Sequence, residues 1–345
     1  MKRIFMMGLI LLGAVYLMPF VTAGSSVSPD DPGTDVDTVP ESIAEEIMNS
    51  GKNQSGDWDK DTKVTVLISG EVREMTLENY LPGVLAAEIP ASFPDEALKA
   101  QAVAARTYVM YKKRLVELGS APPESHKGAV LCDDPKHCKA YIDINAKAEE
   151  LWGSKADEYV KKITDAVKAT DGMAATYQNE PIAAVFHAAS SPKTESAADV
   201  WGADTPYLKS VDSPGGEASP KYSATVEVPD TEFREKFLKK YPDAKLDAPI
   251  NTWFKASIRS EAGGIISVEV GGVRVSGTVI REMFALNSTN FTLSFTENTI
   301  TFHTTGYGHG VGLSQYGARQ MALDGKTWED IIKWYYQGVT ITKEG

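Results

Sequence analysis

The chain of 345 residues is 42% hydrophobic and carries a formal net charge of −12, with a sequence pI near 5.0. This length suits one large domain or two smaller ones with a substantial core. The excess of acidic residues argues against a protein held on nucleic acid by counterion release. Two cysteines are too few for a disulfide-framed scaffold. We therefore expect a globular protein with no nucleic-acid partner.

The first 23 residues predict a membrane segment. Lys2 and Arg3 precede a mostly apolar run over residues 4–23, which is long enough to span a hydrocarbon core of roughly 30 Å. The basic start orients the chain with its remainder outside the cytoplasm. We expect an uncleaved single-pass anchor at the cell membrane, with a removed signal peptide as the alternative because residues 21–23 resemble a cleavage site.

Residues 24–62 differ in composition from the rest of the chain. They contain ten acidic and two basic residues, a net charge of −8, together with three prolines and few large apolar side chains. Low hydrophobicity and self-repulsion favour an extended chain. We expect a flexible linker between the membrane and a folded domain over residues 63–345.

The folded part mixes helix and strand patterns without regular βαβ alternation, which predicts an α+β fold of helices and antiparallel strands. A strand-rich stretch over about residues 215–300 indicates an inserted subdomain. The expected helices cover residues 77–89, 94–117, 159–170, 231–240, 279–285, 313–323 and 328–336, and the expected strands cover residues 63–69, 181–188, 224–228, 265–270 and 273–275.

Glu88 is a candidate general acid. It lies among small and apolar residues just before Pro90. Partial desolvation there would raise the pKa of its carboxyl group. The alternative is a solvated glutamate at the end of a helix.

A second candidate site contains both cysteines and two of the five histidines: His126, Cys132, His137 and Cys138. Two thiolates and two imidazoles can complete a tetrahedral zinc site with no open position, which is typical of structural zinc. The alternative is a short-loop disulfide, which is common in exported proteins.

A third candidate lies around His187 and Ser190, where an apolar run ends in a hydroxyl-rich turn. Such a turn suits a sugar-binding rim, although a helix cap explains it as well. The fourth candidate is Gly306–Gly317, with glycine at every second position from 306 to 312 and Tyr307 and His309 between them. It fits a polysaccharide-binding groove or a tight turn before a helix.

Four segments of the chain together resemble the stage II sporulation protein D family of exported, peptidoglycan-cleaving proteins of endospore-forming bacteria. They are Leu81–Pro90, Glu96–Tyr108, Val200–Gly202 and Gly306–Gly317, and the resemblance extends over about residues 64–340. It implies a lytic transglycosylase, which cleaves the β-1,4 bond between N-acetylmuramic acid (MurNAc) and N-acetylglucosamine (GlcNAc) and leaves a 1,6-anhydro end.

In that reaction the C6 hydroxyl of the sugar is the nucleophile, so one carboxylate can serve as acid and then as base. The resemblance implies that Glu88 is this residue, that the His/Cys cluster holds zinc, and that the chemistry itself needs no cofactor. Residues expected to bind substrate are Arg106, His187, Ser190, Thr194, Tyr307, His309, Gln315 and Tyr316.

The resemblance also implies partners and a location. We expect peptide-free glycan strands as substrate, a cell-wall amidase and a membrane scaffold protein of the engulfment machinery as partners, and a place between the mother-cell and forespore membranes. A non-catalytic glycan-binding amidase enhancer remains as an alternative function, and a zinc hydrolase as a third.

Overall fold

The structure is a computed structural model that describes residues 57–135 and 137–344. The predicted membrane segment over residues 1–23 and linker residues 24–56 lie outside the described residues. Within the described ranges, no helix is long and apolar enough to cross a membrane.

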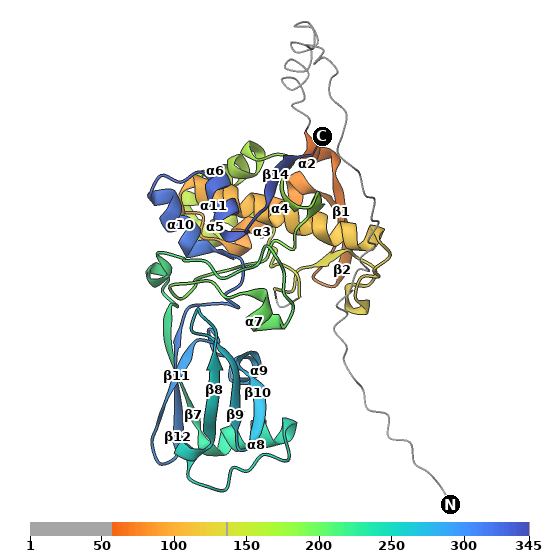
Figure 1. Cartoon of the computed structure of the whole chain (residues 1–345). Helices are drawn as coiled ribbons and strands as arrows, with labels where there is room; N and C mark the ends of the chain where they lie inside the picture. The colour runs from red at the N-terminus through yellow and green to blue at the C-terminus, as the bar shows by residue number, and fades with distance from the viewer. Residues whose placement is uncertain (1–56, 136, 345) are drawn as a thin grey trace, which may run out of the picture. The chain divides into compact units, whose positions relative to one another are not determined.

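The mixed α+β fold is confirmed (Figure 1). The helices are α2 (Trp58–Asp61), α3 (Leu77–Glu88), α4 (Asp95–Glu117), α5 (Ile144–Trp152), α6 (Ala156–Ala169), α7 (Ala197–Trp201), α8 (Asp230–Lys240), α9 (Gly277–Met283), α10 (Gln315–Leu323) and α11 (Trp328–Tyr335). The strands are β1 (Lys63–Ile68), β2 (Glu71–Thr76), β3 (Leu131–Cys132), β4 (Met173–Tyr177), β5 (Glu180–Pro181), β6 (Phe186–His187), β7 (Ser223–Pro229), β8 (Phe254–Arg259), β9 (Ile265–Val270), β10 (Val273–Ser276), β11 (Phe291–Phe295), β12 (Thr299–Thr305), β13 (Leu313–Ser314) and β14 (Thr340–Lys343).

The strands form small sheets with the orders β2-β1-β3, β10-β9-β8, β11-β12-β7, β13-β6 and β14-β4-β5. Most neighbours are antiparallel, whereas β1 with β3 and β13 with β6 are parallel. The β13–β6 pair aligns Leu313 with Phe186 and Ser314 with His187. This pairing brings the segment after Pro181 beside the C-terminal glycine-rich segment, 127 residues further along the chain.

Helix α4 is the centre of the first hydrophobic core. It packs against α3, α6, α10, α11 and β4 (Figure 1). Small buried side chains on α4 allow these neighbours to approach its backbone closely. They include Ala97, Ala100, Ala102, Ala104 and Ala105.

A second hydrophobic core contains buried residues from Val228 to Phe302. Aromatic rings dominate it: the Phe233 ring stacks on Phe284 with centroids 4.8 Å apart and on Phe237 with centroids 5.4 Å apart. Helices α8 and α9 lie beside strands β7–β12 in Figure 1. Buried residues of β7, β9, β10, β11 and β12 contribute to this core, and connecting segments add others such as Leu246 and Trp253.

Several local predictions differ from the structure, which also has strands β2, β4 and β14 that were not predicted. The strand predicted over residues 181–188 is reduced to β5 and β6, because the chain between them bends: the Ala184 N–H donates to Ile182 O and the Val185 N–H donates to Ala183 O. Helix α5 was not predicted, although the Asp143 carboxylate caps it by accepting hydrogen bonds from two backbone N–H groups.

The prediction of a flexible linker up to Thr62 is wrong for its last residues. Trp58–Asp61 form helix α2, and Asp59 is only 3% exposed. The Asp59 carboxylate accepts two hydrogen bonds from the Arg106 guanidinium, at 2.6 and 2.7 Å. This bidentate pair explains why an acidic stretch packs against the core.

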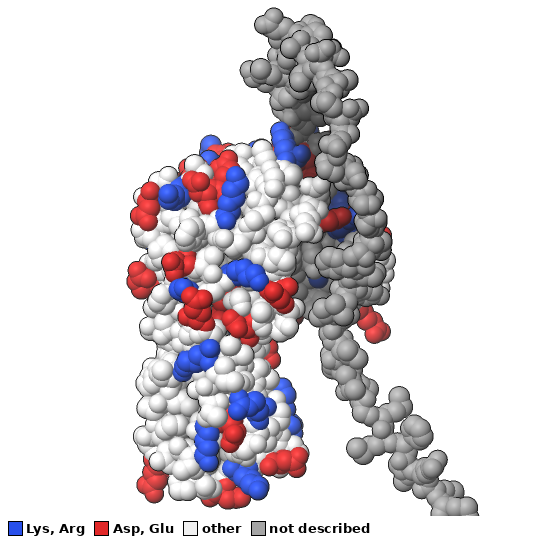
Figure 2. Space-filling view, viewed as in Figure 1, with Lys and Arg blue, Asp and Glu red and all other residues white. Residues whose placement is uncertain are grey.

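Charged side chains of both signs are interspersed on the face of the described residues that Figure 2 shows. Several form exposed ion pairs, among them Lys63 with Glu74 and Arg114 with Glu180. Because such pairs are solvated, they contribute little to stability.

We predict that Arg106→Met destabilises the protein by about 3–5 kcal/mol, because it leaves the Asp59 carboxylate buried without its partner. The measurement is urea unfolding. The matched control is Arg73→Met, which removes an exposed partner of Glu71 and should change stability by no more than about 1 kcal/mol. Equal stability of the two variants would contradict a structural role for Arg106.

Candidate functional site

Glu88 is the last residue of α3, and its side chain is half-buried. The carboxylate oxygen Oε1 accepts a hydrogen bond of 2.8 Å from the Ala140 N–H. Burial raises the pKa of Glu88, while the charge of Lys139 and the Ala140 N–H act in the opposite direction. A raised pKa keeps more of the carboxyl group protonated near neutral pH, as a general acid requires.

Lys139 is a site residue that the sequence analysis missed. Its side chain is only 9% exposed, and its Nζ lies 3.5 Å from the centroid of the Phe186 ring and 4.7 Å from that of Tyr108. Burial lowers the pKa of Lys139 to about 8, and the negative charges of Glu88 and Cys138 oppose this shift. The one signal available in the sequence was its position directly after Cys138.

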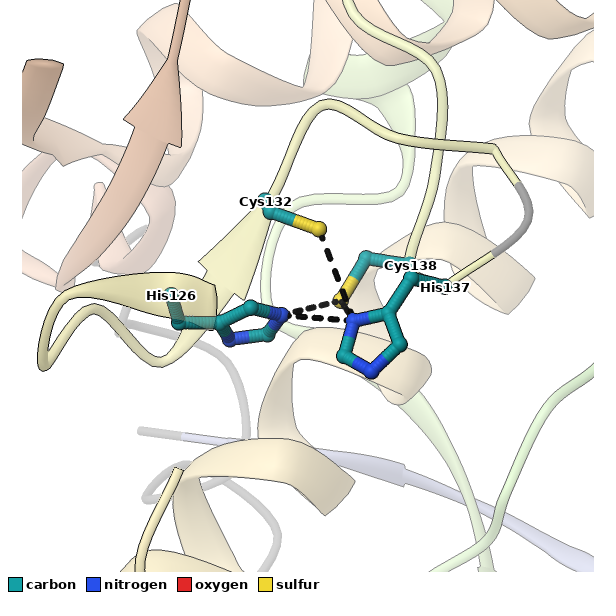
Figure 3. Close-up of side chains that lie close together, drawn as sticks. All are labelled: His126, Cys132, His137 and Cys138. Atoms are coloured by element: carbon teal, nitrogen blue, oxygen red, sulfur yellow. Dashed lines mark hydrogen bonds between the residues drawn. The ribbon is translucent and has the colours of Figure 1, made fainter. Parts of the chain in front are cut away.

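The four His/Cys side chains converge, as Figure 3 shows. His126 ends a short 3₁₀ helix (Glu124–His126), Cys132 ends β3, and His137 and Cys138 follow on the next loop. Their ligand atoms all lie within 4.8 Å of one another. The His126 Nε2 atom lies 2.7 Å from His137 Nδ1 and 3.6 Å from Cys138 Sγ.

This donor set fits a tetrahedral metal ion. The His126 Nδ1–H donates to Ala129 O at 3.1 Å, which leaves Nε2 without a proton and directed at the other three side chains. Both cysteines are free thiols in the structure. The cluster could therefore hold a metal, and its two thiols and two imidazoles match zinc.

The His/Cys cluster is joined to Glu88 through three consecutive residues. Cys138 belongs to the cluster, Lys139 lies close enough to shift the pKa of Glu88, and Ala140 donates the hydrogen bond to the Glu88 carboxylate. The backbone position of the cluster consequently determines the surroundings of the candidate acid.

His309 lies near Lys139. The pKa of His309 is lowered, first by burial and then by the nearby His187 and the positive charge of Lys139. Its Nε2–H donates to Phe186 O at 3.0 Å, and its Nδ1 accepts from the Val311 N–H at 3.1 Å. These bonds define a neutral tautomer. The Trp201 ring lies 5.3 Å from the His309 ring and is 48% exposed, so it offers a flat apolar surface beside the histidine.

His187 and Ser190 form a buried pair that holds the turn. The His187 Nδ1–H donates to Val311 O, and its Nε2 accepts a 2.6 Å hydrogen bond from Ser190 Oγ. Burial lowers the pKa of His187 to about 4, so the ring is neutral at physiological pH. Gly308 must lack a side chain here, because a Cβ atom would lie 2.7 Å from His187 Cβ and its φ is +119°.

The other residues that were expected to bind substrate are Thr194, Gln315, Tyr307, Tyr316 and Arg106, and they differ in burial and in their partners. Thr194 and Gln315 are buried, with hydrogen bonds to the Lys209 carbonyl and the Gln101 side chain. Tyr307 and Tyr316 are half-buried. Arg106 does not join any of these groups: it is fully buried, and its guanidinium binds Asp59 and the carbonyls of Val167 and Met173. The structure thus gives Arg106 a structural role in place of the expected contact with substrate.

Known proteins are similar in sequence to this chain over most of its length. A family model described as "Stage II sporulation protein" matches residues 69–177. A Bacillus subtilis (strain 168) protein named "Stage II sporulation protein D" is 38% identical over 340 residues, which is 97% of this chain and 92% of that protein. The chain belongs to the stage II sporulation protein D family. This family functions in sporulation.

A second member of the stage II sporulation protein D family, from Bacillus amyloliquefaciens, is 41% identical over 272 residues, or 79% of this chain and 76% of that protein. A more distant Bacillus subtilis protein named "Amidase enhancer" is 25% identical over 312 residues, or 76% of this chain and 40% of that protein. The stretch matched by the family model includes Glu88 and the His/Cys cluster, whereas Trp201 and His309 lie beyond it.

We predict that Gly308→Ala destabilises the protein by about 1–3 kcal/mol more than Gly272→Ala, because only the former forces a methyl group against a neighbour. Both glycines have positive φ, but nothing lies within 4 Å of a Cβ atom at Gly272. Urea unfolding of both variants tests this. A similar loss of stability in both variants would mean that the close contact between Gly308 and His187 does not require glycine at position 308.

Proposed function

We propose that this protein is a lytic transglycosylase that cleaves the MurNAc-β-1,4-GlcNAc bond of peptide-free peptidoglycan, with Glu88 as both acid and base. The observation that carries the proposal is the half-buried Glu88 carboxyl group, the pKa of which is raised. Among the described residues, no other carboxylate shifts the pKa of Glu88, and burial is the main cause of its rise.

An ordinary glycosidase uses two carboxylates about 5–9.5 Å apart, one for the leaving group and one for the nucleophile or water. In the proposed reaction the C6 hydroxyl of the substrate takes the place of the second carboxylate, so that Glu88 alone can serve as acid and base.

The reaction then needs one carboxyl group. Glu88 donates its proton to the glycosidic oxygen as the bond from that oxygen to C1 of MurNAc breaks. The C6 hydroxyl of the same sugar attacks C1, and the Glu88 carboxylate takes the hydroxyl proton. An intramolecular attack of this kind gains an effective molarity of about 10⁵ M or more when the groups are well oriented. No water is consumed, and Glu88 returns to its initial protonated state.

We propose that the glycan strand binds at the exposed Trp201 ring and His309, and that the half-buried Tyr307 and Tyr316 also contact it. Flat aromatic surfaces with hydrogen-bonding groups suit sugar rings, and the exposure of Trp201 supports this position. His187, Ser190, Thr194 and Gln315 are buried and hydrogen-bonded, so we assign them to the support of this surface.

We predict that Glu88→Gln lowers the release of 1,6-anhydro-muramyl products from peptide-free glycan by at least about a hundredfold, since an amide cannot transfer the proton. Chromatography of the digest measures it. The control is Glu78→Gln at the start of the same helix, which should retain activity. Full activity in Glu88→Gln would contradict the assignment.

We also infer that the His/Cys cluster binds a structural zinc ion that holds the Cys138–Ala140 segment against Glu88. Zinc bound by four protein ligands has no open position for water. This counts against the third alternative, a zinc hydrolase. The free thiols in the structure support a metal site over a disulfide.

We predict one zinc per chain by elemental analysis of the purified protein, and its loss in His126→Ala, because three ligands hold the ion less tightly than four. His303, an exposed histidine of β12, is the control: His303→Ala should keep the zinc. A full complement of zinc in His126→Ala, or no zinc in the unaltered protein, would contradict the site.

A second candidate function is a non-catalytic glycan-binding amidase enhancer, favoured by the 25% identity to the protein of that name. In either role we propose a cell-wall amidase and a membrane scaffold protein of the engulfment machinery as partners, with the folded part outside the cytoplasm and tethered by the N-terminal segment. Activity of the purified chain alone separates the two candidates, because an enhancer releases no glycan product without an amidase.

A further inference from the structure

The ammonium group of Lys139 has no hydrogen-bond acceptor among the described residues. Its stem is enclosed and its Nζ lies on the faces of Phe186 and Tyr108. No carboxylate lies within ion-pair distance of it in the described part of the chain. Buried lysines are nearly always paired, and cation–π contacts replace only part of the lost hydration. An ammonium in this position therefore retains three N–H donors for something else.

Lys139 is buried, but its Nζ atom is not among the completely enclosed, unpartnered polar atoms of the described residues. Lys139 directly precedes Ala140, whose N–H binds Glu88. Its Nζ lies over the ring of Phe186, whose carbonyl accepts the hydrogen bond from His309. Lys139 is thus linked by short contacts to both the candidate acid and the histidine that lies beside Trp201.

The proposed substrate carries one kind of anionic group, which occurs once in each MurNAc residue. MurNAc bears a lactyl ether on its O3 atom, and this group ends in a free carboxylate when no stem peptide is attached. When a peptide is attached, the same carbon forms a neutral amide. A carboxylate accepts charge-assisted hydrogen bonds from an ammonium, whereas an amide or ester forms a weaker contact and adds bulk.

We propose that Lys139 binds the free lactyl carboxylate of the MurNAc residue at the cleavage site and so makes the protein selective for strands without stem peptides. This inference rests on the proposed function, since it takes peptidoglycan as the ligand. It assigns Lys139 as a specificity-determining residue. The His/Cys cluster contributes by fixing the backbone of the preceding residue, Cys138.

A competing explanation is that Lys139 acts only on the protonation of Glu88. In that case its removal would change the rate of cleavage but would not affect how the protein distinguishes free from blocked lactyl groups. Binding experiments without cleavage separate the two explanations.

The test uses Glu88→Gln as a non-cleaving background and a peptide-free tetrasaccharide of alternating GlcNAc and MurNAc as the probe. Its affinity is compared by calorimetry with that of the same tetrasaccharide after methyl esterification of the lactyl carboxylates. We expect the free acid to bind about tenfold more tightly or better, the ratio typical of a charge-assisted hydrogen bond. In Glu88→Gln/Lys139→Gln the two affinities should become equal because only the acid loses affinity.

Two further variants control for folding and charge. Glu88→Gln/Lys139→Arg keeps the positive charge and should retain a preference for the acid. Lys112 lies 5.8 Å from the Tyr108 ring on helix α4, and Lys112→Gln in the same background should leave the preference unchanged. Each comparison is between two ligands bound to the same variant. A modest loss of stability in that variant therefore does not change the ratio of the two affinities.

Equal affinity of the two probes in the Glu88→Gln background would overturn the proposal. The same holds if the preference survives in Lys139→Gln, or if that variant loses affinity for both probes equally. The proposed function fails on a different result, namely when the unaltered protein releases no anhydro product. In that case the preference for the free acid over the methyl ester in the Glu88→Gln background still decides the role of Lys139.

Discussion

The hydrogen bond from the Ala140 N–H to the Glu88 carboxylate connects the parts of the candidate site. It joins the end of α3 to a loop that has no regular secondary structure and that begins at His137 and Cys138 of the His/Cys cluster. Burial raises the pKa of the Glu88 carboxyl group, whereas the Ala140 N–H and the charge of Lys139 lower it. The protonation of Glu88 therefore depends on the conformation of residues 138–140.

The second half of the site depends on a different constraint, the close approach of two segments distant in sequence. Short parallel pairing between β6 and β13 brings the His187 turn against the glycine-rich segment. His187 and Ser190 fill this junction as a neutral, hydrogen-bonded pair. As a result His309 is held in one tautomer beside the exposed Trp201 ring. His187 and His309 both hydrogen-bond to the backbone of Val311, so the buried pair and the histidine beside Trp201 share one support.

Sequence patterns predicted the long elements well, because α4 and the β9–β10 hairpin carry strong periodic signals. They predicted the short ones poorly. Residues 181–188 are apolar enough for a strand, but local bends limit them to two short pieces. Arg106 was predicted to bind substrate because it lies in Glu96–Tyr108, one of the segments that carry the family resemblance. It instead pairs with Asp59, a residue that composition assigned to a linker. Lys139 carries no pattern of its own, since only the folded loop brings it to Glu88 and to two aromatic rings.

The central claim is that Glu88 works with a hydroxyl group of the substrate and without water as nucleophile. It is tested most directly by digesting peptide-free glycan in water enriched in oxygen-18 and measuring product masses. The account predicts 1,6-anhydro products without the heavy isotope, because the new bond to C1 is formed by the sugar's own O6 atom. New reducing MurNAc ends in place of anhydro ends would contradict it, since only attack by water on C1 produces them.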